Sequence, residues 1–312
     1  MTPTDSILVF DIGGTKLATA LLLPDSTIYG RQEAATLAHE GAQAVLARLI
    51  ALGHAVVSAA PTHRVAALGV ASGGQIEPST GAVVHATDNI PGWTGLPLGE
   101  RLGAEFGLPT VVENDANCFA LAEAVLGAGQ GYRHLLVVAV GTGVGAGILI
   151  DGQLYSGWQG KAGEVGHLLI EPQNGRPCTC GQQGCLESYT ATRIIVAASG
   201  YPTIHALAAA YRAGAAIPAV AEAAGWLGIG LASLAHLLGP EAIVIGGSVG
   251  LLGERYLAQV RHHFVEHAMR SYRSIPIHAA ALPPTVVCWG LVCWHGGAFY
   301  REFCLKTVVF VY

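Results

Sequence analysis

Two apolar runs near the N-terminus flank a short polar turn. Residues 7–10 (Ile-Leu-Val-Phe) lead into Asp-Ile-Gly-Gly-Thr-Lys at residues 11–16, and an apolar run rich in Leu and Ala follows at residues 17–23. Apolar runs of this length around a glycine-containing turn predict a β-hairpin. The turn is not a Walker motif, which has a longer glycine-to-lysine spacing and leads directly into a helix.

The same arrangement returns in the middle of the chain. Residues 135–140 and 148–150 are apolar, and residues 141–147 between them read Gly-Thr-Gly-Val-Gly-Ala-Gly. A repeated strand–turn–strand unit predicts a protein built from two related halves. Because glycines let backbone amides approach an anion closely, we expect the two turns to face each other across a cleft and hold phosphate groups. Either turn alone is also typical of an ordinary tight hairpin.

The rest of the pattern alternates strands with helices, which predicts an α/β protein. Further strands are expected at residues 29–33, 65–71, 110–112, 242–245 and 275–281, and helices at 39–58, 96–106, 113–126 and 254–269, with about three more up to residue 238. Glycine turns follow two of these strands, at residues 72–74 and 246–248, where α/β folds usually bind ligands. The length of 312 residues favours two domains. We place them at residues 1–117 and 118–282, ahead of a tail at 283–312.

Composition narrows the choice of partners and location. Only 12% of residues are charged and the net charge is −5, which argues against a nucleic acid or an anionic membrane as partner. No segment is expected to span a bilayer, since the best candidate, residues 135–150, is interrupted by glycines. The N-terminus lacks the basic region and the cleavage site of a secretion signal, and Asp11 and Lys16 interrupt its apolar stretch, so a cytoplasmic protein is predicted.

Three cysteines stand close together in a loop-rich region. Cys178, Cys180 and Cys185 lie within eight residues, and His167 lies just upstream. Three thiolates and an imidazole complete a tetrahedral Zn²⁺ site with no position left for water, so the sequence predicts a structural zinc. Free thiols or a redox pair are the alternative, and His167 is the less certain ligand because other histidines are present.

Several motifs occur together in the order found in one protein family. They are residues 11–16, Glu-Asn-Asp-Ala-Asn at 113–117, Gly-Thr-Gly-Val-Gly at 141–145, Glu-Val-Gly-His at 164–167, the cysteine loop at 178–187, and Gly-Gly-Ser at 246–248. With these motifs the chain resembles the ROK family of bacterial sugar kinases (repressor, open reading frame, kinase). The resemblance covers residues 7 to about 282. It implies a two-domain, actin-like ATPase fold of the ribonuclease H type, with a cleft between the domains and a zinc-binding loop at 167–187.

The resemblance implies ATP-dependent phosphorylation of a hexose hydroxyl by a glucokinase-like enzyme that uses Mg²⁺. Asp115 matches the family's catalytic base, although an Asp before a helix is also a common N-cap. Asp11 is of the right type to hold a hydrated Mg²⁺. The residues expected to bind the nucleotide are Asp11, Gly13, Gly14, Thr15, Lys16, Gly141, Thr142, Gly143, Val144, Gly145, Gly246 and Gly247. The residues expected to contact the sugar are Asn89, Asn114, Asp115, Glu164, His167 and Glu187, and Trp93 is either a stacking partner for the sugar or a packing residue.

Two further readings of the function stay open at this point. The first alternative is that the sugar is an N-acetylhexosamine rather than glucose, as in N-acetylmannosamine or N-acetylglucosamine kinases. The second is that the protein senses a sugar without turnover. About six residues precede the first predicted strand, so we expect no DNA-binding helix-turn-helix there. The family likeness also implies a homodimer.

The tail departs from the family pattern. Residues 285–312 hold three of the seven cysteines and two of the five tryptophans, and they do not resemble the family's closing helix. Our hypothesis is that the tail is read in a shifted frame, which predicts exposed apolar surface and reduced solubility or activity. Sequencing the source gene tests it, because a single frame shared with close relatives would contradict the idea.

Overall fold

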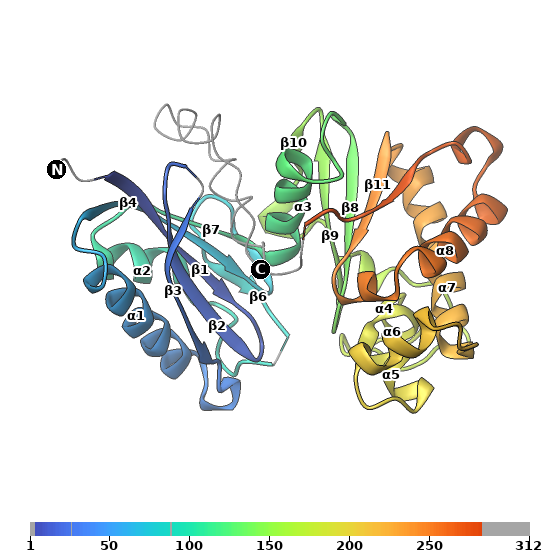
Figure 1. Cartoon of the computed structure of the whole chain (residues 1–312), viewed down its shortest axis with the longest axis horizontal. Coiled ribbons are helices and arrows are strands. Elements are labelled where there is room, and N and C mark those ends of the chain that lie inside the picture. The colour runs from blue at the N-terminus through green and yellow to red at the C-terminus, as the bar shows by residue number, and fades with distance from the viewer. Residues whose placement is uncertain (1–3, 26, 88, 283–312) are drawn as a thin grey trace. The chain divides into compact units, whose positions relative to one another are not determined.

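The computed structural model describes residues 4–25, 27–87 and 89–282. These residues form two compact units (Figure 1). Of the described residues, unit 1 contains those up to residue 125 together with residues 156–162, and unit 2 contains residues 126–155 and 163–282. The division expected after residue 117 falls inside helix α3 (Asp115–Leu126). The tail at 283–312 and the shifted-frame hypothesis lie outside the described residues.

Unit 1 is built on a five-stranded mixed sheet in the order β3-β2-β1-β4-β7. Its strands are β1 (Thr4–Ile12), β2 (Lys16–Leu22), β3 (Ile28–Ala35), β4 (His63–Ser72) and β7 (Thr110–Asn114). The first three run antiparallel, whereas β4 and β7 run parallel to β1. A separate ribbon joins β5 (Gln75–Ile76) to β6 (Val83–His85). The predicted hairpin around residues 11–16 is thus confirmed.

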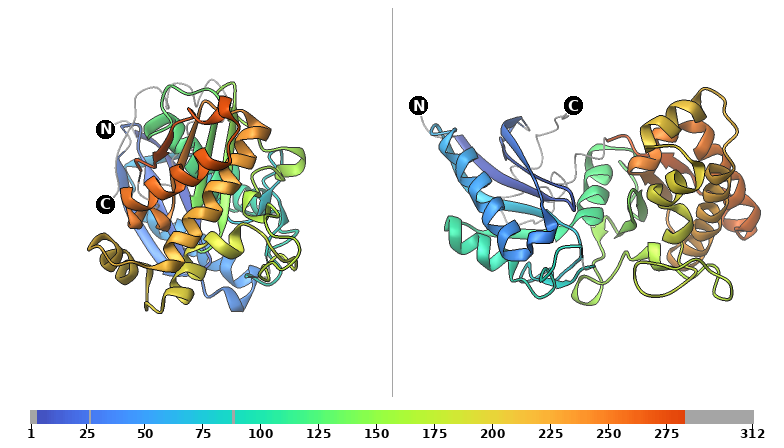
Figure 2. Two further views of the ribbon diagram at one scale, coloured as in Figure 1. Left: turned by 90° about the vertical axis from the view of Figure 1, so that its right-hand side faces the viewer. Right: turned by 90° about the horizontal axis from the view of Figure 1, so that it is seen from below.

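Helices α1 (Ala42–Ser58) and α2 (Leu98–Phe106) lie on one face of this sheet (Figure 2). The buried face of α1 includes Val45, Leu46 and Leu49, which recur at helical spacing and pack on the strands. Close packing makes one glycine of α1 necessary. A Cβ on Gly53 would lie 2.8 Å from the ring of Phe10 and 2.7 Å from the ring of Phe106, so a larger residue would force the helix off the sheet.

Unit 2 repeats the strand order of unit 1. Its sheet reads β10-β9-β8-β11-β12, with β8 (Leu135–Val140), β9 (Val144–Ile150), β10 (Gln153–Leu154), β11 (Ala242–Gly246) and β12 (Ile277–Ala279). Again three strands joined by hairpins run antiparallel, and two further strands lie parallel to the first of them. The prediction of two related halves is therefore confirmed at the level of topology.

Helices cover one face of the second sheet (Figure 2). They are α4 (Glu187–Thr190), α5 (Thr192–Ser199), α6 (Ile204–Arg212), α7 (Pro218–Leu238) and α8 (Glu254–His267). The region up to residue 238 thus holds four helices rather than three, because one short turn, α4, precedes α5. Single 3-10 turns complete the described chain at Ala38–Glu40, Trp158–Gly160, Val165–His167, Ser248–Leu252 and Arg270–Tyr272.

One helix passes a test of length and composition that no segment was expected to pass. Helix α7 has 21 residues and a mean hydropathy of 1.3, so by length and composition it is able to cross a bilayer. Residues 135–150, the candidate that the sequence suggests, instead form the strands β8 and β9. Ten residues of α7 are buried in the unit, among them Val220, Leu227 and Leu231, and they pack with α8 and the sheet. Burial of this kind is expected of the central helix of a folded core, which passes the same hydropathy test.

Candidate active site and metal centre

Two carboxylates meet at one edge of the unit 1 sheet. Asp11 lies near the end of β1, and its register partner on β4 is Ala71, whose partner on β7 is Glu113. Asp115 follows two residues later, at the start of α3. Because β1, β4 and β7 are parallel, their carboxyl ends lie together, and the charge of Asp115 acts on Asp11. The two acids most relevant to the predicted chemistry are therefore neighbours.

The helix that begins at Asp115 is capped by the residue before it. The side-chain oxygen of Asn114 accepts hydrogen bonds from the backbone N–H groups of Ala116 (2.9 Å) and Asn117 (3.2 Å), the pattern of an N-cap. Its amide nitrogen donates to the carbonyl of Gly74 (2.8 Å) and so fixes the glycine turn after β4. Asn114 thus occupies the N-cap position, while a carboxylate oxygen of Asp115 also accepts the N–H of Ala116 at 2.8 Å.

The carboxyl group of Asp11 has an unusual proton affinity. Burial raises its pKa, and the neighbouring charge of Asp115 raises it further, to about 6. Lys16 and Arg31 oppose this shift less strongly. Glu113 also has a raised pKa because it is buried, although its carboxylate accepts hydrogen bonds from Asn117 (3.0 Å) and the backbone of Asn114. Glu113 therefore supports the strand end, whereas Asp11 faces the partly open edge.

The turn after β1 has an ordered base and an exposed tip. The N–H of Gly13 donates to the carbonyl of Lys16 (3.0 Å), and the hydroxyl of Thr36 donates to the carbonyl of Gly13 (2.6 Å). Gly14 and Thr15 are exposed at the tip. The ammonium group of Lys16 donates to Glu33 at 2.9 Å. Lys16 of β2 thus forms an ion pair with Glu33 of β3, while the tip of the turn is exposed.

The corresponding turn of unit 2 is held from several sides. The hydroxyl and the N–H of Thr192 both donate to the carbonyl of Gly141 at 2.8 Å. The hydroxyl of Ser248, in the turn after β11, lies 3.0 Å from that of Thr192. Gly247 has a φ of +83°, and a Cβ there would lie 2.5 Å from the carbonyl oxygen of Val140. The glycine turns that follow β8 and β11 therefore form one continuous edge of backbone groups.

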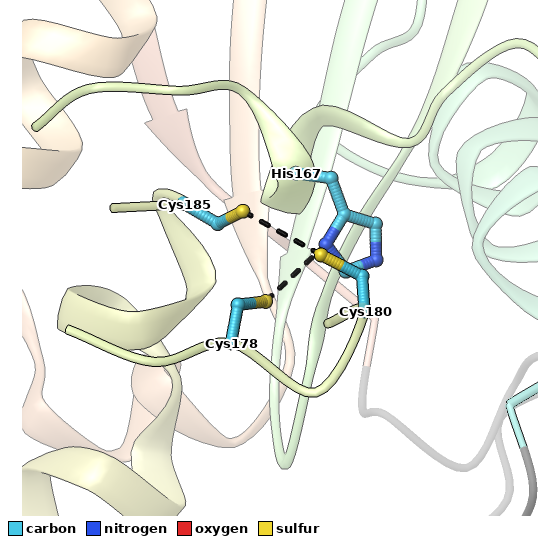
Figure 3. A group of neighbouring side chains, drawn as sticks. All are labelled: His167, Cys178, Cys180 and Cys185. Carbon is cyan, nitrogen blue, oxygen red and sulfur yellow. Dashed lines mark hydrogen bonds between the residues drawn. The ribbon is translucent and has the colours of Figure 1, made fainter. Parts of the chain in front are cut away.

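Four side chains of unit 2 converge as the sequence predicted (Figure 3). One donor atom from each of His167, Cys178, Cys180 and Cys185 lies within 4.8 Å of all the others. The sulfurs of Cys180 and Cys185 are 3.7 Å apart, and the sulfur of Cys178 is 3.5 Å from Nδ1 of His167. A tetrahedral zinc site requires donor separations of about 3.8 Å between two sulfurs and about 3.6 Å between sulfur and nitrogen, given its bond lengths. The cluster is thus consistent with zinc in both donor set and size.

The histidine of this cluster has its two ring nitrogens in different surroundings. Nδ1 faces Cys178, whereas Nε2 lies 3.9 Å from a carboxylate oxygen of Glu164. This separation is longer than a hydrogen bond, so Glu164 is near the ring without fixing its orientation. Among the site residues predicted to contact sugar, Glu164 and His167 therefore lie together beside the metal centre.

The thiols of the cluster differ in acidity. Burial raises the pKa of Cys178, but hydrogen bonds from Cys180 and His167 outweigh it and bring the pKa to about 7. Burial and the neighbouring thiols raise the pKa of Cys185 to about 12. A bound cation would remove this difference, because a metal-bound thiol is deprotonated. The described cysteines of this loop are all free of disulfides.

Two predicted sugar contacts have neighbours within unit 1. Asn89 is exposed, and its amide donates to the hydroxyl of Thr87 at 2.9 Å. Trp93 is only 2% exposed, belongs to the core cluster of unit 1 and donates from its indole nitrogen to the hydroxyl of Ser72 (3.2 Å). Of the two roles considered for Trp93, packing is the one that the structure supports.

Several residues that matter for the geometry were not predicted. Thr36 braces the first turn, Thr192 braces the second, and Thr179 and Arg193 bind the carboxylate of Glu187. Nothing in their local sequence distinguishes these residues from ordinary threonines and arginines. Thr179 offered the one available signal, because it lies between two predicted zinc ligands.

Comparison with known proteins identifies the family. The model of the ROK family matches residues 7–285 of this chain. The chain belongs to the ROK family. The two mixed sheets with their helices are the actin-like fold of that family, as the resemblance had implied.

This ROK protein is similar to both kinases and regulators. A glucokinase from Halalkalibacterium halodurans is 35% identical over 282 residues, covering 83% of this chain and 85% of the relative. An N-acetylmannosamine kinase from Citrobacter koseri is 35% identical over 268 residues (84% and 89% covered). A xylose repressor from Caldicellulosiruptor bescii is 30% identical over 246 residues (72% and 61% covered). The family therefore unites catalysts with proteins that regulate transcription.

A solved structure extends the likeness to a ligand-bound relative. The ROK family glucokinase from Streptomyces griseus, determined in complex with glucose and AMPPNP, is 30% identical and superposes with a TM-score of 0.79. The match covers 92% of this chain and 97% of that one. That relative binds a hexose and an ATP analogue in the same fold.

Proposed function

We propose that this ROK protein transfers the terminal phosphoryl group of ATP to a hydroxyl of a hexose, with Asp115 as the general base. The observation that carries the proposal is the pairing of Asp115 with Asp11 at one sheet edge, together with the capping of α3 by Asn114 rather than by Asp115. Two glucokinases that are 35% and 30% identical, over 83% and 86% of this chain, support the same activity.

The proposed chemistry uses the two acids differently. Phosphoryl transfer depends on an aligned nucleophile and on neutralised phosphate charge more than on covalent catalysis. Asp115 accepts the proton of the attacking sugar hydroxyl, so that the oxygen attacks with its full electron density. Asp11 offers the hard oxygen ligands that Mg²⁺ prefers and would hold the ion. When bound, Mg²⁺ neutralises charge on the phosphates.

The glycine turns provide the proposed nucleotide contacts. The exposed tip at Gly14 and Thr15 presents backbone and hydroxyl donors suited to phosphate oxygens. The turn at 141–145 and the edge at Gly246 and Gly247 present further backbone groups within unit 2. Lys16 reaches phosphate only by leaving Glu33, which an exposed ion pair permits at small cost.

Glucose is the first proposed acceptor, and an N-acetylhexosamine is the second. The relatives include kinases for both kinds of sugar. The proposed sugar contacts remain Asn89, Asn114, Asp115, Glu164, His167 and Glu187. Asn114 would use the amide hydrogen that does not bond Gly74. His167 offers the sugar its Nε2 while Nδ1 faces the cysteines.

An ATP-coupled assay tests the function and the sugar together. Purified protein is assayed with glucose, mannose, fructose, N-acetylmannosamine and N-acetylglucosamine, and zinc is measured in the same preparation by metal analysis. Turnover on glucose supports the first proposal, and preference for an N-acetylhexosamine supports the second. Sugar binding in a calorimeter without turnover on any of the five would contradict both and favour a sugar sensor related to the family's repressors.

Two further expectations concern the state of the protein. The homodimer that the resemblance implies is tested by light scattering coupled to size-exclusion chromatography, where a monomer's mass of 32.1 kDa would contradict it. The cytoplasmic location stays a prediction, and fractionation of the source cells tests it.

A further inference from the structure

Thr36 is a buried residue that the proposed chemistry does not use. It directly follows β3, and its exposed fraction is 0%. Its hydroxyl donates to the carbonyl of Gly13 at 2.6 Å, and its backbone N–H donates to the carbonyl of Thr15 at 3.0 Å. A single residue thus binds two carbonyls of the turn that joins β1 to β2.

A hydrogen bond to a carbonyl also orients the amide of the same peptide group. In the trans peptide between Gly13 and Gly14, the C=O and the N–H point in opposite directions. Because the Thr36 hydroxyl holds the carbonyl on its own side, the N–H of Gly14 points away from that buried side chain. Gly14 is exposed, and its N–H donates to no other described residue. This donor is therefore available to an anion.

The two glycines do not hold this orientation by themselves. A peptide group turns over by rotation about ψ of the residue before it and φ of the residue after it, and glycine tolerates a wide range of both angles. Turned over, the group between Gly13 and Gly14 would present its carbonyl oxygen to a phosphate and repel it. Among the described residues, the hydroxyl of Thr36 is the one donor to the Gly13 carbonyl. The orientation of this peptide thus depends on that hydroxyl.

Unit 2 holds its own turn with a second threonine. The hydroxyl and the N–H of Thr192, at the start of α5, both donate to the carbonyl of Gly141 at 2.8 Å. Gly141 is the first residue after β8, as Gly13 is the first after β1. The N–H of Thr142, which is exposed, accordingly points away from Thr192. In unit 2 a backbone bond duplicates the hydroxyl bond, whereas the Gly13 carbonyl has the hydroxyl bond alone.

We propose that Thr36 is a positioning residue that turns the amides of the β1–β2 turn, rather than its carbonyls, toward the phosphates of a nucleotide. The inference rests on the proposed kinase function for the identity of the anion. Thr36 itself contacts no ligand, because its side chain is buried and its hydroxyl is engaged with Gly13. Thr192 acts in the same way in unit 2, with a smaller share carried by its hydroxyl.

The deciding variant is Thr36→Val, which keeps the shape of the side chain and removes the hydroxyl. Calorimetric titrations measure the affinity for a non-hydrolysable ATP analogue with Mg²⁺ and, separately, for glucose. We expect nucleotide affinity to fall by about fivefold to tenfold, the equivalent of one net hydrogen bond, and glucose affinity to change by less than about twofold. Thr36→Ser keeps the hydroxyl and should bind nucleotide within about twofold of wild type, and Thr192→Val should lose less than Thr36→Val. Unchanged nucleotide affinity in Thr36→Val, or an equal loss in Thr36→Ser, would overturn the proposal.

Thr110→Val is the matched control for a general loss of stability. This threonine begins β7, and its hydroxyl also donates to a backbone carbonyl, that of Leu108 at 3.1 Å. Because β7 and β1 both run parallel to β4, Thr110 lies at the opposite end of the sheet from the turn after β1. We expect similar shifts of the denaturant midpoint in Thr36→Val and Thr110→Val, with nucleotide affinity lost only in the former. An equal loss of nucleotide affinity in both would reduce Thr36 to a stabilising contact.

A second measurement does not depend on any ligand. Hydrogen exchange of the peptide spanning residues 11–18 is compared in wild type, Thr36→Val, Thr36→Ser and Thr110→Val. The N–H of Gly13, which closes the turn by donating to the carbonyl of Lys16, should exchange faster in Thr36→Val alone. Wild type that binds no nucleotide contradicts the proposed function, whereas the exchange data still decide whether Thr36 holds the turn. Unchanged exchange in Thr36→Val would overturn the positioning role even in an active kinase.

Discussion

The two halves of this protein share a strand order but not a chemistry. In both sheets a three-residue turn joins the first two antiparallel strands, after Ile12 in unit 1 and after Val140 in unit 2. The last pairs of the two hairpins are Ile12–Leu17 and Val140–Val144. One residue back from these pairs, Asp11 of β1 corresponds to Ala139 of β8. The same backbone position thus carries a carboxylate in one half and a methyl group in the other.

The two turns also differ in the contacts that hold them. The tip in unit 1 is exposed, and a Cβ on Gly14 would meet nothing within 4 Å. In unit 2, Thr192, Arg193 and Glu187 hold the turn, and the cysteines of the His/Cys cluster lie on the adjoining loop. The comparison teaches that the two turns of a duplicated fold have diverged. A buried acid lies beside the exposed turn of unit 1, whereas side chains from several segments hold the turn of unit 2.

The largest expected effect follows from removing the base in unit 1. Asp115→Ala should lower kcat by about a thousandfold or more, because general-base catalysis contributes on the order of 10² to 10⁴. Sugar affinity measured by calorimetry should change little. Asp151→Asn, an exposed acid of unit 2 paired with Arg133, is the matched control with near-normal turnover. Turnover within about threefold of wild type in Asp115→Ala would rule out the assigned role.

Loss of the metal should affect the two halves unequally. Cys180→Ser should abolish zinc in metal analysis and lower the free energy of unfolding by about 3 kcal/mol or more, since metal binding contributes to folding. Hydrogen exchange should rise first in the peptides of β8 and β11, whereas β1 and β4 keep their protection. Equal loss of protection in both sheets would show that the halves do not respond separately. A zinc content unchanged in this variant would exclude the cluster as the metal site.

The buried acid of unit 1 should make stability depend on pH. The pKa of Asp11 is raised from 3.8 to about 6, so between these values the folded protein binds more protons than the unfolded chain. Its contribution to stability therefore falls as pH rises from about 4 to 6, and Asp11→Asn should stabilise the protein at pH 7 by up to about 3 kcal/mol. Denaturant titrations at pH 4 and pH 7 measure this difference, which should disappear near pH 4.

The same titration should appear in the activity. Protonated Asp11 loses its charge for the cation, so turnover should decrease as pH falls through about 6. A rate profile flat from pH 5 to pH 8, measured at saturating Mg²⁺, would contradict the role of Asp11.

The smallest expected effects compare the two turns directly. Gly14→Ala should change the free energy of unfolding by less than about 0.5 kcal/mol, because its side of the turn is open. Gly143→Ala should cost about 1–2 kcal/mol, since the new methyl group must displace the carboxylate of Glu187. Thermal or denaturant unfolding of the two variants measures the difference, and equal losses would remove the contrast between the turns.

Features encoded by short spacing could be predicted from the sequence alone. Both hairpins follow from apolar runs around glycine turns, and the convergence of the three cysteines follows from their closeness in one loop. Neighbours along the chain are held near each other by covalent geometry. The motif order was sufficient to place the chain in the ROK family and hence to predict the actin-like fold.

Only the tertiary structure decided the contacts between distant segments. Sheet register brings Asp115 beside Asp11, Asn114 takes the cap that Asp115 might have filled, and Trp93 turns into the core. Helix α7 could be recognised as a core helix only from what buries it. Glu187 shows the reason most clearly, because its environment is made by Val144, Thr179 and Arg193 from three separate segments. Hydrogen bonds and desolvation depend on which atoms folding brings together, and no local pattern records that.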